Sequence, residues 1–307
     1  MSTTFPSGRA GGRHRTAAVK QSALRRIVVP ALLVVLGLIV MLYPVVASQW
    51  NNHVQRGVAQ QYHDIMEEQK ANEPEFIQRS LVDARVYNEE HTDGPILDPW
   101  LARVSKDNGE YQHYLSQLSG FPAMSQVTIP AINSKLPVYH GTDESTLQKG
   151  LGHLFGSALP IGGEGMHSVI TGHTGITNAT LWDNLIDVKE GDDVYVSTFG
   201  EQLKYKVYDI ETVLPNETDS LKAQEGRDLL TLVTCTPYGI NSHRLLVHAE
   251  RVPFDQGDED IVSATGGWTM QWWMWLVLAV ALAVAVGLTW WIRRTLAGEK
   301  EKSDEQN

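Results

Sequence analysis

Residues 229–251 read LLTLVTCTPYGINSHRLLVHAER and contain two runs rich in leucine, valine and threonine, with turn-forming residues between them. This composition is typical of two short β-strands joined by a loop. If the strands are antiparallel neighbours, the end of the first and the start of the second lie at the same edge of the sheet. Cys235 and Arg244 are then expected side by side, although eight residues separate them in the sequence.

The same β pattern begins near residue 124 and continues to residue 252. Asn133 and Ser134 separate the first two runs, and Phe199-Gly200-Glu201 has the composition of a hairpin turn. Short strands at this spacing favour a closed or nearly closed barrel over a sheet of βαβ units, so we expect a mainly β fold. The runs lie within residues 125–141, 167–173, 192–215, 228–235 and 244–252.

Residues 51–90 have a helical pattern instead. Val54, Val58, Tyr62 and Met66 recur four residues apart, and a second apolar stripe follows the break at NEPE. One apolar stripe per helix is typical of helices that pack on a larger body.

Two segments near the barrel have loop composition. Residues 90–104, EHTDGPILDPWLARV, contain a glycine and two prolines and are expected to form a loop. Within it, Asp98-Pro99-Trp100 places an acid next to a large aromatic residue. Residues 253–267, PFDQGDEDIVSATGG, are expected to be an acidic linker.

Two uncharged runs of 21 residues, 27–47 and 272–292, are long enough to cross the ~30 Å hydrocarbon core of a membrane as helices. Tryptophans lie at both ends of the second run, as in an interfacial aromatic belt. The alternative for the first run is a cleaved signal peptide, because residues 45–47 resemble a cleavage site. Signal peptides have apolar segments of only ~7–15 residues, which favours a retained anchor.

The flanking charges predict the orientation of both spans. Six basic and no acidic residues lie in the first 26 positions, and Arg293 and Arg294 follow the second span. By the positive-inside rule both tails are cytoplasmic and the segment between the spans lies outside the cell. The N-terminal tail carries a charge of +6, and the charges of the C-terminal tail balance. Because the whole chain has a net charge of −11, the segment between the spans carries −17, which disfavours nucleic-acid binding.

These patterns predict a domain order along the chain. A helical extension with a loop and a barrel lie between the two membrane spans, and short tails lie outside them. The expected boundaries are a basic cytoplasmic tail (1–26), a transmembrane helix (27–47), the helical extension (48–123) with its loop (90–104), the barrel (124–255), a linker (256–271), a second transmembrane helix (272–292) and a cytoplasmic tail (293–307).

Cys235 is the only cysteine in the chain. Exported domains normally use cysteines in pairs, so an unpaired one indicates a reactive thiol or an intermolecular bridge. The ordinary alternative is a buried cysteine that acts as a small apolar residue.

A reactive thiol needs a base or a positive group beside it. His173 is the best-placed histidine, because VITGHTG (169–175) ends a strand in small, turn-forming residues and leaves the imidazole at an edge. His243 adjoins Arg244 and is an alternative to His173 as the base, whereas His248 lies within a strand and is expected to be structural. The remaining histidines of the β region are expected to be ordinary surface residues: His140, His153 and His167.

The sequence favours neither a metal site nor a phosphate-binding loop. One cysteine and scattered histidines give no zinc-ligand set. The IGGEG segment (161–165) lacks the lysine and the strand-to-helix context of a phosphate loop. No cofactor is expected.

Together these motifs resemble the sortases, which are cysteine transpeptidases of Gram-positive cell surfaces. TLVTC followed by a spaced arginine is similar to the family's TLxTC motif, and VITGHTG is similar to its histidine segment. HLFGSALPIGGEG (153–165) resembles the segment before that histidine. The resemblance covers residues 124–252 and implies an eight-stranded sortase β-barrel.

Two membrane spans, a helical extension and an Asp-Pro-aromatic segment resemble the pilus-assembling class C. The resemblance implies that Cys235 is the nucleophile, His173 the acid/base and Arg244 the cation that stabilises the oxyanion or positions substrate. It also implies that Asp98, Pro99 and Trp100 form a lid in which the acid engages the arginine and the aromatic covers the cysteine. The alternative is a surface loop whose tryptophan packs on the barrel.

The chain departs from the family pattern beside these motifs. Family members often carry Glu at the position of Phe155, Arg at Thr174 and Phe at Trp100. These departures concern substrate detail more than catalysis.

The resemblance implies cleavage of an LPxTG-like sorting signal between Thr and Gly and transfer of the acyl group to a pilin lysine. Implied partners are therefore pilin or surface proteins that carry such a signal. Three other functions fit the same residues: a housekeeping sortase that anchors proteins to peptidoglycan, a secreted cysteine hydrolase, and a membrane-anchored scaffold with an inert thiol.

Overall fold

The structure is a computed structural model that describes residues 13–91, 98, 105, 107–176, 179–264 and 270–304. Its contacts divide the chain into two compact units. One comprises Met1–Val46 with Met270–Asn307, and the other is Ala47–Thr269. Each unit is described by itself.

The first unit is built from two long helices. Helix α1 (Arg13–Asn72) begins in this unit and continues into the second, and α6 (Trp272–Asp304) lies entirely in the first. Both contain apolar stretches long enough to cross a bilayer, within Arg25–Asn72 and Trp272–Gly298. Large apolar side chains such as Leu33 and Leu282 are exposed on them, which suggests association with a membrane.

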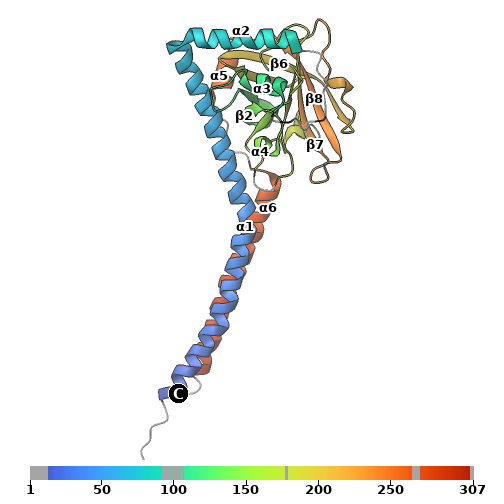
Figure 1. Cartoon of the computed structure of the whole chain (residues 1–307). Helices are drawn as coiled ribbons and strands as arrows, with labels where there is room; N and C mark the ends of the chain where they lie inside the picture. Colours follow the sequence, from blue (N-terminus) through green and yellow to red (C-terminus); the bar gives the residue numbers. More distant parts are fainter. Residues whose placement is uncertain are drawn as a thin grey trace, which may run out of the picture. The chain divides into compact units, whose positions relative to one another are not determined.

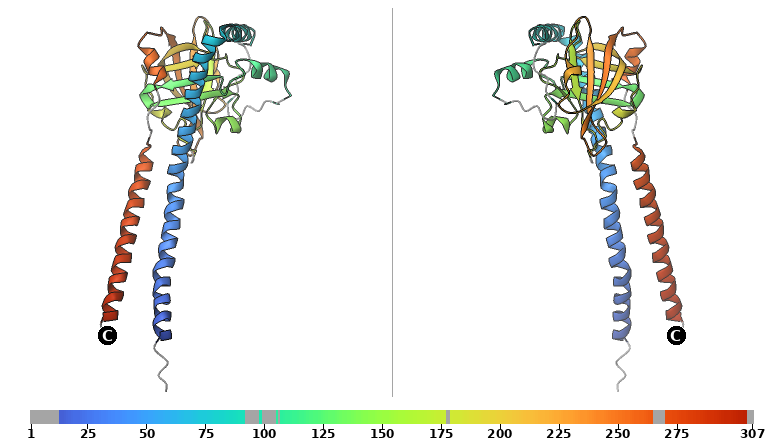
Figure 2. Two further views of the ribbon diagram at one scale, coloured as in Figure 1. Left: turned by 90° about the vertical axis from the view of Figure 1, so that its left-hand side faces the viewer. Right: turned by 90° about the vertical axis from the view of Figure 1, so that its right-hand side faces the viewer.

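The second unit contains a closed eight-stranded barrel (Figures 1 and 2). The strands follow one another around it in the order β1-β2-β3-β4-β7-β8-β6-β5, which confirms the predicted closed barrel. Two of the neighbouring pairs are parallel, β2 with β3 and β4 with β7. The strands are β1 (Ser125–Ile129), β2 (Ser134–His140), β3 (Leu151–His153), β4 (His167–Thr171), β5 (Asp193–Thr198), β6 (Glu201–Val213), β7 (Leu229–Thr236) and β8 (His243–Val252).

The turn between β5 and β6 occurs where the sequence predicts it. Phe199 and Gly200 both have positive φ, +47° and +81°, which suits a two-residue hairpin turn. A Cβ on Gly200 would lie against the side chain of Lys70 on α1, so this glycine also allows the helix to approach the turn closely.

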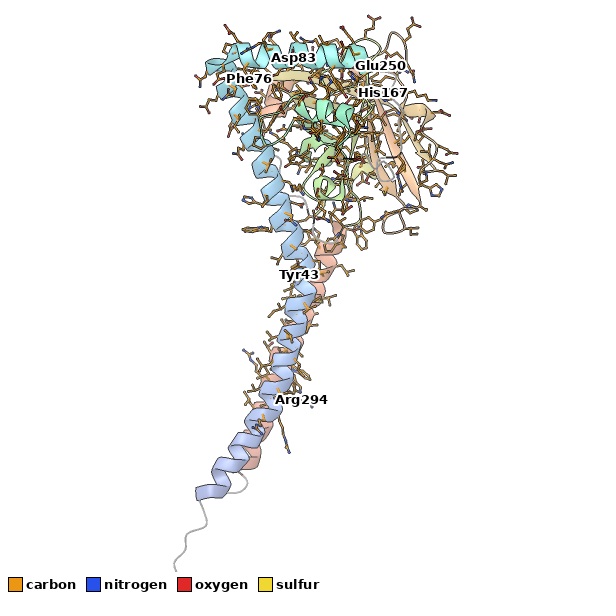
Figure 3. The ribbon with its side chains drawn as sticks, viewed as in Figure 1. Tyr43, Phe76, Asp83, His167, Glu250 and Arg294 are labelled. Atoms are coloured by element: carbon orange, nitrogen blue, oxygen red, sulfur yellow. The ribbon has the colours of Figure 1, made fainter. Side chains whose placement is uncertain are left out.

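Three helices pack against the barrel and share its apolar core. They are α1, α2 (Pro74–His91) and α3 (Gly109–Ser116), which contribute buried residues such as Tyr62, Leu81 and Tyr114. The break between α1 and α2 lies within the NEPE segment, as predicted. Figure 3 labels two residues of α2, Phe76 and Asp83.

The buried stripe of α1 differs from the predicted one. Tyr62 and Met66 are buried as expected, but Val54 is 46% exposed. Towards its N-terminal end the stripe consists instead of Asn52 and Gln55, which are polar and buried. An apolar pattern could not reveal them, because both side chains are polar; Asn52 is hydrogen-bonded to Thr180.

The predicted acidic linker contains a short helix, α5 (Asp258–Ser263). Asp258 is buried and accepts hydrogen bonds from Tyr195 Oη (2.7 Å) and Lys204 Nζ (2.9 Å). These contacts dock the helix on strands β5 and β6, so this part of the segment is ordered structure rather than a flexible connection.

Candidate active site

Strands β4, β7 and β8 bring three candidate residues to one rim of the barrel. The antiparallel register of β7 and β8 pairs Cys235 directly with Arg244, which confirms their predicted proximity. β4 runs parallel to β7, and its last paired residue, Thr171, lies opposite Val233. The same register extended by two residues places His173 level with Cys235.

Two hydrogen bonds support this extension beyond the end of β4. The Gly172 amide donates to Val233 O (3.0 Å), and Thr234 Oγ1 donates to Gly172 O (2.7 Å). The chain therefore still follows β7 one residue before the histidine. Cys235 thus has Arg244 on one neighbouring strand and His173 beyond the end of the other.

His173 has a carboxylate partner from a distant segment. Its Nε2 lies 3.2 Å from Glu144 Oε2, on the short helix α4 (Glu144–Leu147). A hydrogen bond from Gln148 and, to a smaller extent, the nearby imidazole lower the pKa of Glu144. Glu144 was not among the residues predicted from the sequence, because it lies 29 positions before His173 and no local pattern connects them.

The segment after His173 is held by a second carboxylate. Asp183 Oδ1 accepts hydrogen bonds from Thr174 Oγ1 (3.1 Å) and the Gly175 amide (2.7 Å). Burial raises the pKa of Asp183 to about 6, against these two hydrogen bonds that lower it. The Trp182 amide also donates to His173 O (3.1 Å).

The thiol of Cys235 is buried, with 8% of the residue exposed. Burial raises its pKa to about 11; the nearby Arg244 guanidinium lowers the pKa and Asp98 raises it. At neutral pH the thiol is therefore protonated in this conformation, and a thiol is a much weaker nucleophile than a thiolate. Cys235 is thus buried, as expected of a structural cysteine, although it lies at the rim of the barrel.

Arg244 is paired with Asp98. Its Nε and Nη2 donate to the two carboxylate oxygens of Asp98, at 2.6 and 3.2 Å, and both residues are buried. Arg244 Nη1 also donates to the carbonyls of Asn241 and His243, each at 3.2 Å. This bidentate pair occupies two of the nitrogen atoms of the guanidinium. Pro99 and Trp100, the other predicted lid residues, lie outside the described residues.

The prediction that His153 and His167 are surface residues is wrong. His153 is fully buried on β3, a strand too short to be recognised in the sequence, and hydrogen-bonds Tyr114 Oη and Ala158 O. His167 is 2% exposed. Burial lowers the pKa of each to about 4, so both are neutral at physiological pH.

The other histidines are positioned as follows. His248 is buried within β8, as expected of a structural residue. His243 is partly exposed and lies 2.9 Å from Ser242 Oγ through Nδ1. His140 is half-buried, and burial lowers its pKa. Within the part of the chain that the structure describes, no three His, Cys, Asp or Glu residues converge as metal ligands.

Known proteins are similar to this chain in both sequence and fold. The sortase domain family model matches residues 127–252. Sortase A of Streptococcus agalactiae is 28% identical over 149 residues, which are 47% of this chain and 60% of that protein. The chain thus spans about three fifths of this relative's length.

Two solved structures extend the similarity beyond the barrel. The crystal structure of sortase C-1 from Actinomyces oris is 54% identical, with a TM-score of 0.56, and the match covers 58% of this chain and 99% of that one. Sortase C of Streptococcus pneumoniae, whose structure is described in relation to catalysis and pilin substrate specificity, is 37% identical with a TM-score of 0.58; that match covers 64% and 97% of the two chains. The chain belongs to the sortase family of cysteine transpeptidases.

Proposed function

We propose that this chain is a membrane-anchored, class C sortase that polymerises pilins. Its substrate would be an LPxTG-like sorting signal, cleaved between Thr and Gly, and its acceptor a pilin lysine. The observation that carries the proposal is the register pairing of Cys235 with Arg244 on a sortase barrel, with His173 beyond the neighbouring strand end. The similarity to sortase C proteins over nearly their whole length supports the class.

In the first half-reaction, the thiol proton of Cys235 passes to His173, and Cys235 Sγ attacks the threonine carbonyl carbon to form a carbon–sulfur bond. The carbonyl oxygen becomes an oxyanion, which Arg244 stabilises as a fixed cation in a sheltered site. The bond from that carbon to the glycine nitrogen then breaks. His173 gives a proton to the departing amine, which leaves a threonyl thioester on Cys235.

In the second half-reaction, a lysine amine attacks the thioester carbonyl. A carbon–nitrogen bond forms, the carbon–sulfur bond breaks, and the amine gives up its extra proton to His173. The product is an isopeptide bond between two subunits, and the thiolate of Cys235 is regenerated. Water in place of the amine would give hydrolysis by the same residues.

Asp98 gives the site a closed state. With its carboxylate on Arg244, the guanidinium cannot face an oxyanion, and the negative charge opposes formation of the thiolate. Catalysis therefore requires that Asp98 leave Arg244, so the segment around it acts as a lid together with Pro99 and Trp100. A buried ion pair gains little net free energy, because desolvation offsets the attraction, and this makes its opening feasible.

The two apolar helices support a location at the membrane. Basic residues precede the first span and follow the second, so both termini would be cytoplasmic and the barrel extracellular. A pilin held in the same membrane by its own anchor would present its sorting signal to this side.

The test offers competing acceptors to the purified full-length enzyme. A sorting-signal peptide is incubated with a pilin-derived lysine peptide and a peptidoglycan stem peptide at equal concentration, and products are identified by mass spectrometry. The proposal predicts an isopeptide product with the pilin lysine and none with Cys235→Ala. Preferential transfer to the stem peptide would indicate a housekeeping enzyme, exclusive hydrolysis would indicate a hydrolase, and no reaction would indicate a scaffold.

A further inference from the structure

Helix α1 is hydrogen-bonded to the segment that carries His173. Asn52 Nδ2 donates to Thr180 Oγ1 (2.8 Å), and the Thr180 amide donates to Asn52 Oδ1 (3.1 Å). Both residues are buried, each 6% exposed. The carboxamide thus holds the side chain and the backbone of Thr180 at once, which fixes both the position and the orientation of that residue.

Thr180 is connected to His173 through the two residues that hold the histidine backbone. Trp182, two positions on, donates its amide to His173 O, and Asp183 accepts from Thr174 and Gly175. The Trp182 ring also packs so closely on Gly172 that a Cβ there would lie 2.9 Å from it. A displacement of Thr180 would therefore be transmitted to both sides of His173.

The surroundings of this junction are mostly polar. A small cavity of about 30 Å³ lies between α1 and the barrel here, lined in part by Gln55, Ser134 and Asn184. Within the described residues, one buried side-chain oxygen of each of these three has no hydrogen-bond partner. The paired hydrogen bonds of Asn52 are thus a specific link in mostly polar surroundings, next to the buried Leu136 and Leu181.

We propose that Asn52 is a positioning residue for His173, and that α1 is in this way a working part of the active site as well as the connection to the membrane-spanning unit. The inference rests on the proposed function, since it assumes that His173 is the acid/base. It predicts that loss of the Asn52–Thr180 link misplaces the imidazole and lowers kcat while leaving substrate binding nearly unchanged.

The test compares two links between α1 and the barrel. Asn52→Ala removes the link to Thr180, whereas Tyr62→Phe removes a hydroxyl that bonds Met124 O and the Phe199 amide, away from the histidine segment. Rates of thioester formation with a sorting-signal peptide are measured on the full-length enzyme, each variant combined with Asp98→Ala so that lid opening does not limit the rate. Asn52→Ala should lower kcat about 10-fold with KM within about 2-fold, and Tyr62→Phe should keep kcat within about 2-fold.

A second pair covers the case in which Asn52→Ala fails to fold. Thr180→Val is nearly isosteric but lacks the hydroxyl that accepts from Asn52, whereas Thr180→Ser retains it. In Thr180→Val, kcat should be lower and the limb of the pH–rate profile assigned to His173 should shift. In Thr180→Ser, both should remain as in the parent enzyme. A purely structural role would move neither the profile nor kcat beyond the loss of folded protein.

Two results would overturn the proposal. One is unchanged kcat in both Asn52→Ala and Thr180→Val; the other is a loss in Tyr62→Phe that equals the loss in Asn52→Ala at equal Tm. Failure of the proposed function is distinguishable, because the parent enzyme would then form no thioester on Cys235 at all.

Discussion

Strands β4, β7 and β8 carry two comparable sets of polar side chains. Near one end of the strands, His167, Thr231 and His248 are joined by hydrogen bonds of 2.7 and 2.8 Å through the threonine hydroxyl. At the other end, His173, Cys235 and Arg244 lie at the rim. Figure 3 labels His167, which starts β4, whereas His173 follows its end.

In the first set each polar side chain is hydrogen-bonded to partners on the strands or beside them. His167 Nδ1 lies 3.0 Å from Lys222 O and must donate to it, so its Nε2 accepts from the Thr231 hydroxyl. His248 Nδ1 lies 2.8 Å from the same hydroxyl oxygen, and His248 Nε2 lies 3.1 Å from Glu211 Oε1. All these partners lie on strands or on segments that contact them.

In the second set the partner of the cation comes from outside the barrel. Arg244 is held by Asp98, which precedes α3 and belongs to no strand. We therefore propose that the strands fix the positions of the candidate reactive groups, and that the segment of Asp98 controls whether they can react. In this proposal the same three strands support a structural and a chemical site, which differ in whether the partner of the charged group belongs to the barrel.

The largest expected effect is a loss of catalytic rate when His173 at the rim of the barrel is replaced. His173→Ala should lower the rate of thioester formation by about 10²–10⁴-fold, because the departing amine loses its proton donor. The matched change in the other set, Thr231→Val, should leave kcat within about 2-fold. Steady-state kinetics with a sorting-signal peptide measures both variants. An equal loss of kcat in the two would contradict the assignment of one set as chemical and the other as structural.

The next effect is on the reactivity of Cys235 when Asp98, the partner of Arg244, is replaced. Asp98→Ala frees Arg244 and removes a negative charge that opposes the thiolate, so the pKa of Cys235 should fall from about 11. Each unit of that fall raises the thiolate fraction tenfold, and we expect alkylation at pH 8 to become at least about 10-fold faster. Asp83→Ala on α2 is the control, and equal rates in wild type and Asp98→Ala would show that Asp98 does not restrain the thiol.

A smaller effect is expected on stability at the structural set. Thr231→Val leaves the ring nitrogens of His167 and His248 that faced the hydroxyl buried without it. Stranded buried polar groups cost about 1–3 kcal/mol each, so we expect the free energy of unfolding to fall by about 2–3 kcal/mol. Thermal unfolding in detergent measures this, and an unchanged Tm would mean that the network contributes nothing to the fold.

The smallest effect concerns Asp183, which supports the histidine segment. Burial raises the pKa of Asp183 to about 6, above the ordinary value of about 3.9, so the protonated carboxyl stabilises the folded state. This contribution is complete below pH 4 and is lost as the pH rises through 6. Relative to Asp183→Asn, wild type should lose about 1–2 kcal/mol between pH 4 and 7, after a discount for partial exposure. Parallel stability curves for the two proteins over this range would contradict the assignment.

The parts of the molecule that depend on local pattern were predictable from the sequence. The strands around Cys235 and Arg244 and the turn at Gly200 are encoded by neighbouring residues, and pairing of adjacent strands then places the thiol beside the guanidinium. The lid role proposed for Asp98 rests on family resemblance rather than on any spacing.

The remaining parts depend on contacts between distant segments. β3 has only three residues and forms because β2 and β4 lie on either side of it, and its burial of His153 follows from that. Glu144, Asp183 and Asn52 each contact the segment that carries His173 through only one or two hydrogen bonds, which leave no periodic signal. The helix α5 within the predicted linker forms because Asp258 finds partners on the barrel.

The most direct test of the central claim is mass spectrometry of the intact full-length protein after incubation with a sorting-signal peptide. The Asp98→Ala variant, in which the lid acid is absent, is measured beside wild type and Cys235→Ala. We predict a covalent adduct on Cys235 whose mass corresponds to the peptide up to and including threonine, more abundant in Asp98→Ala and missing in Cys235→Ala. Release of cleaved peptide without any adduct on Cys235, or an adduct on another residue, would contradict the account.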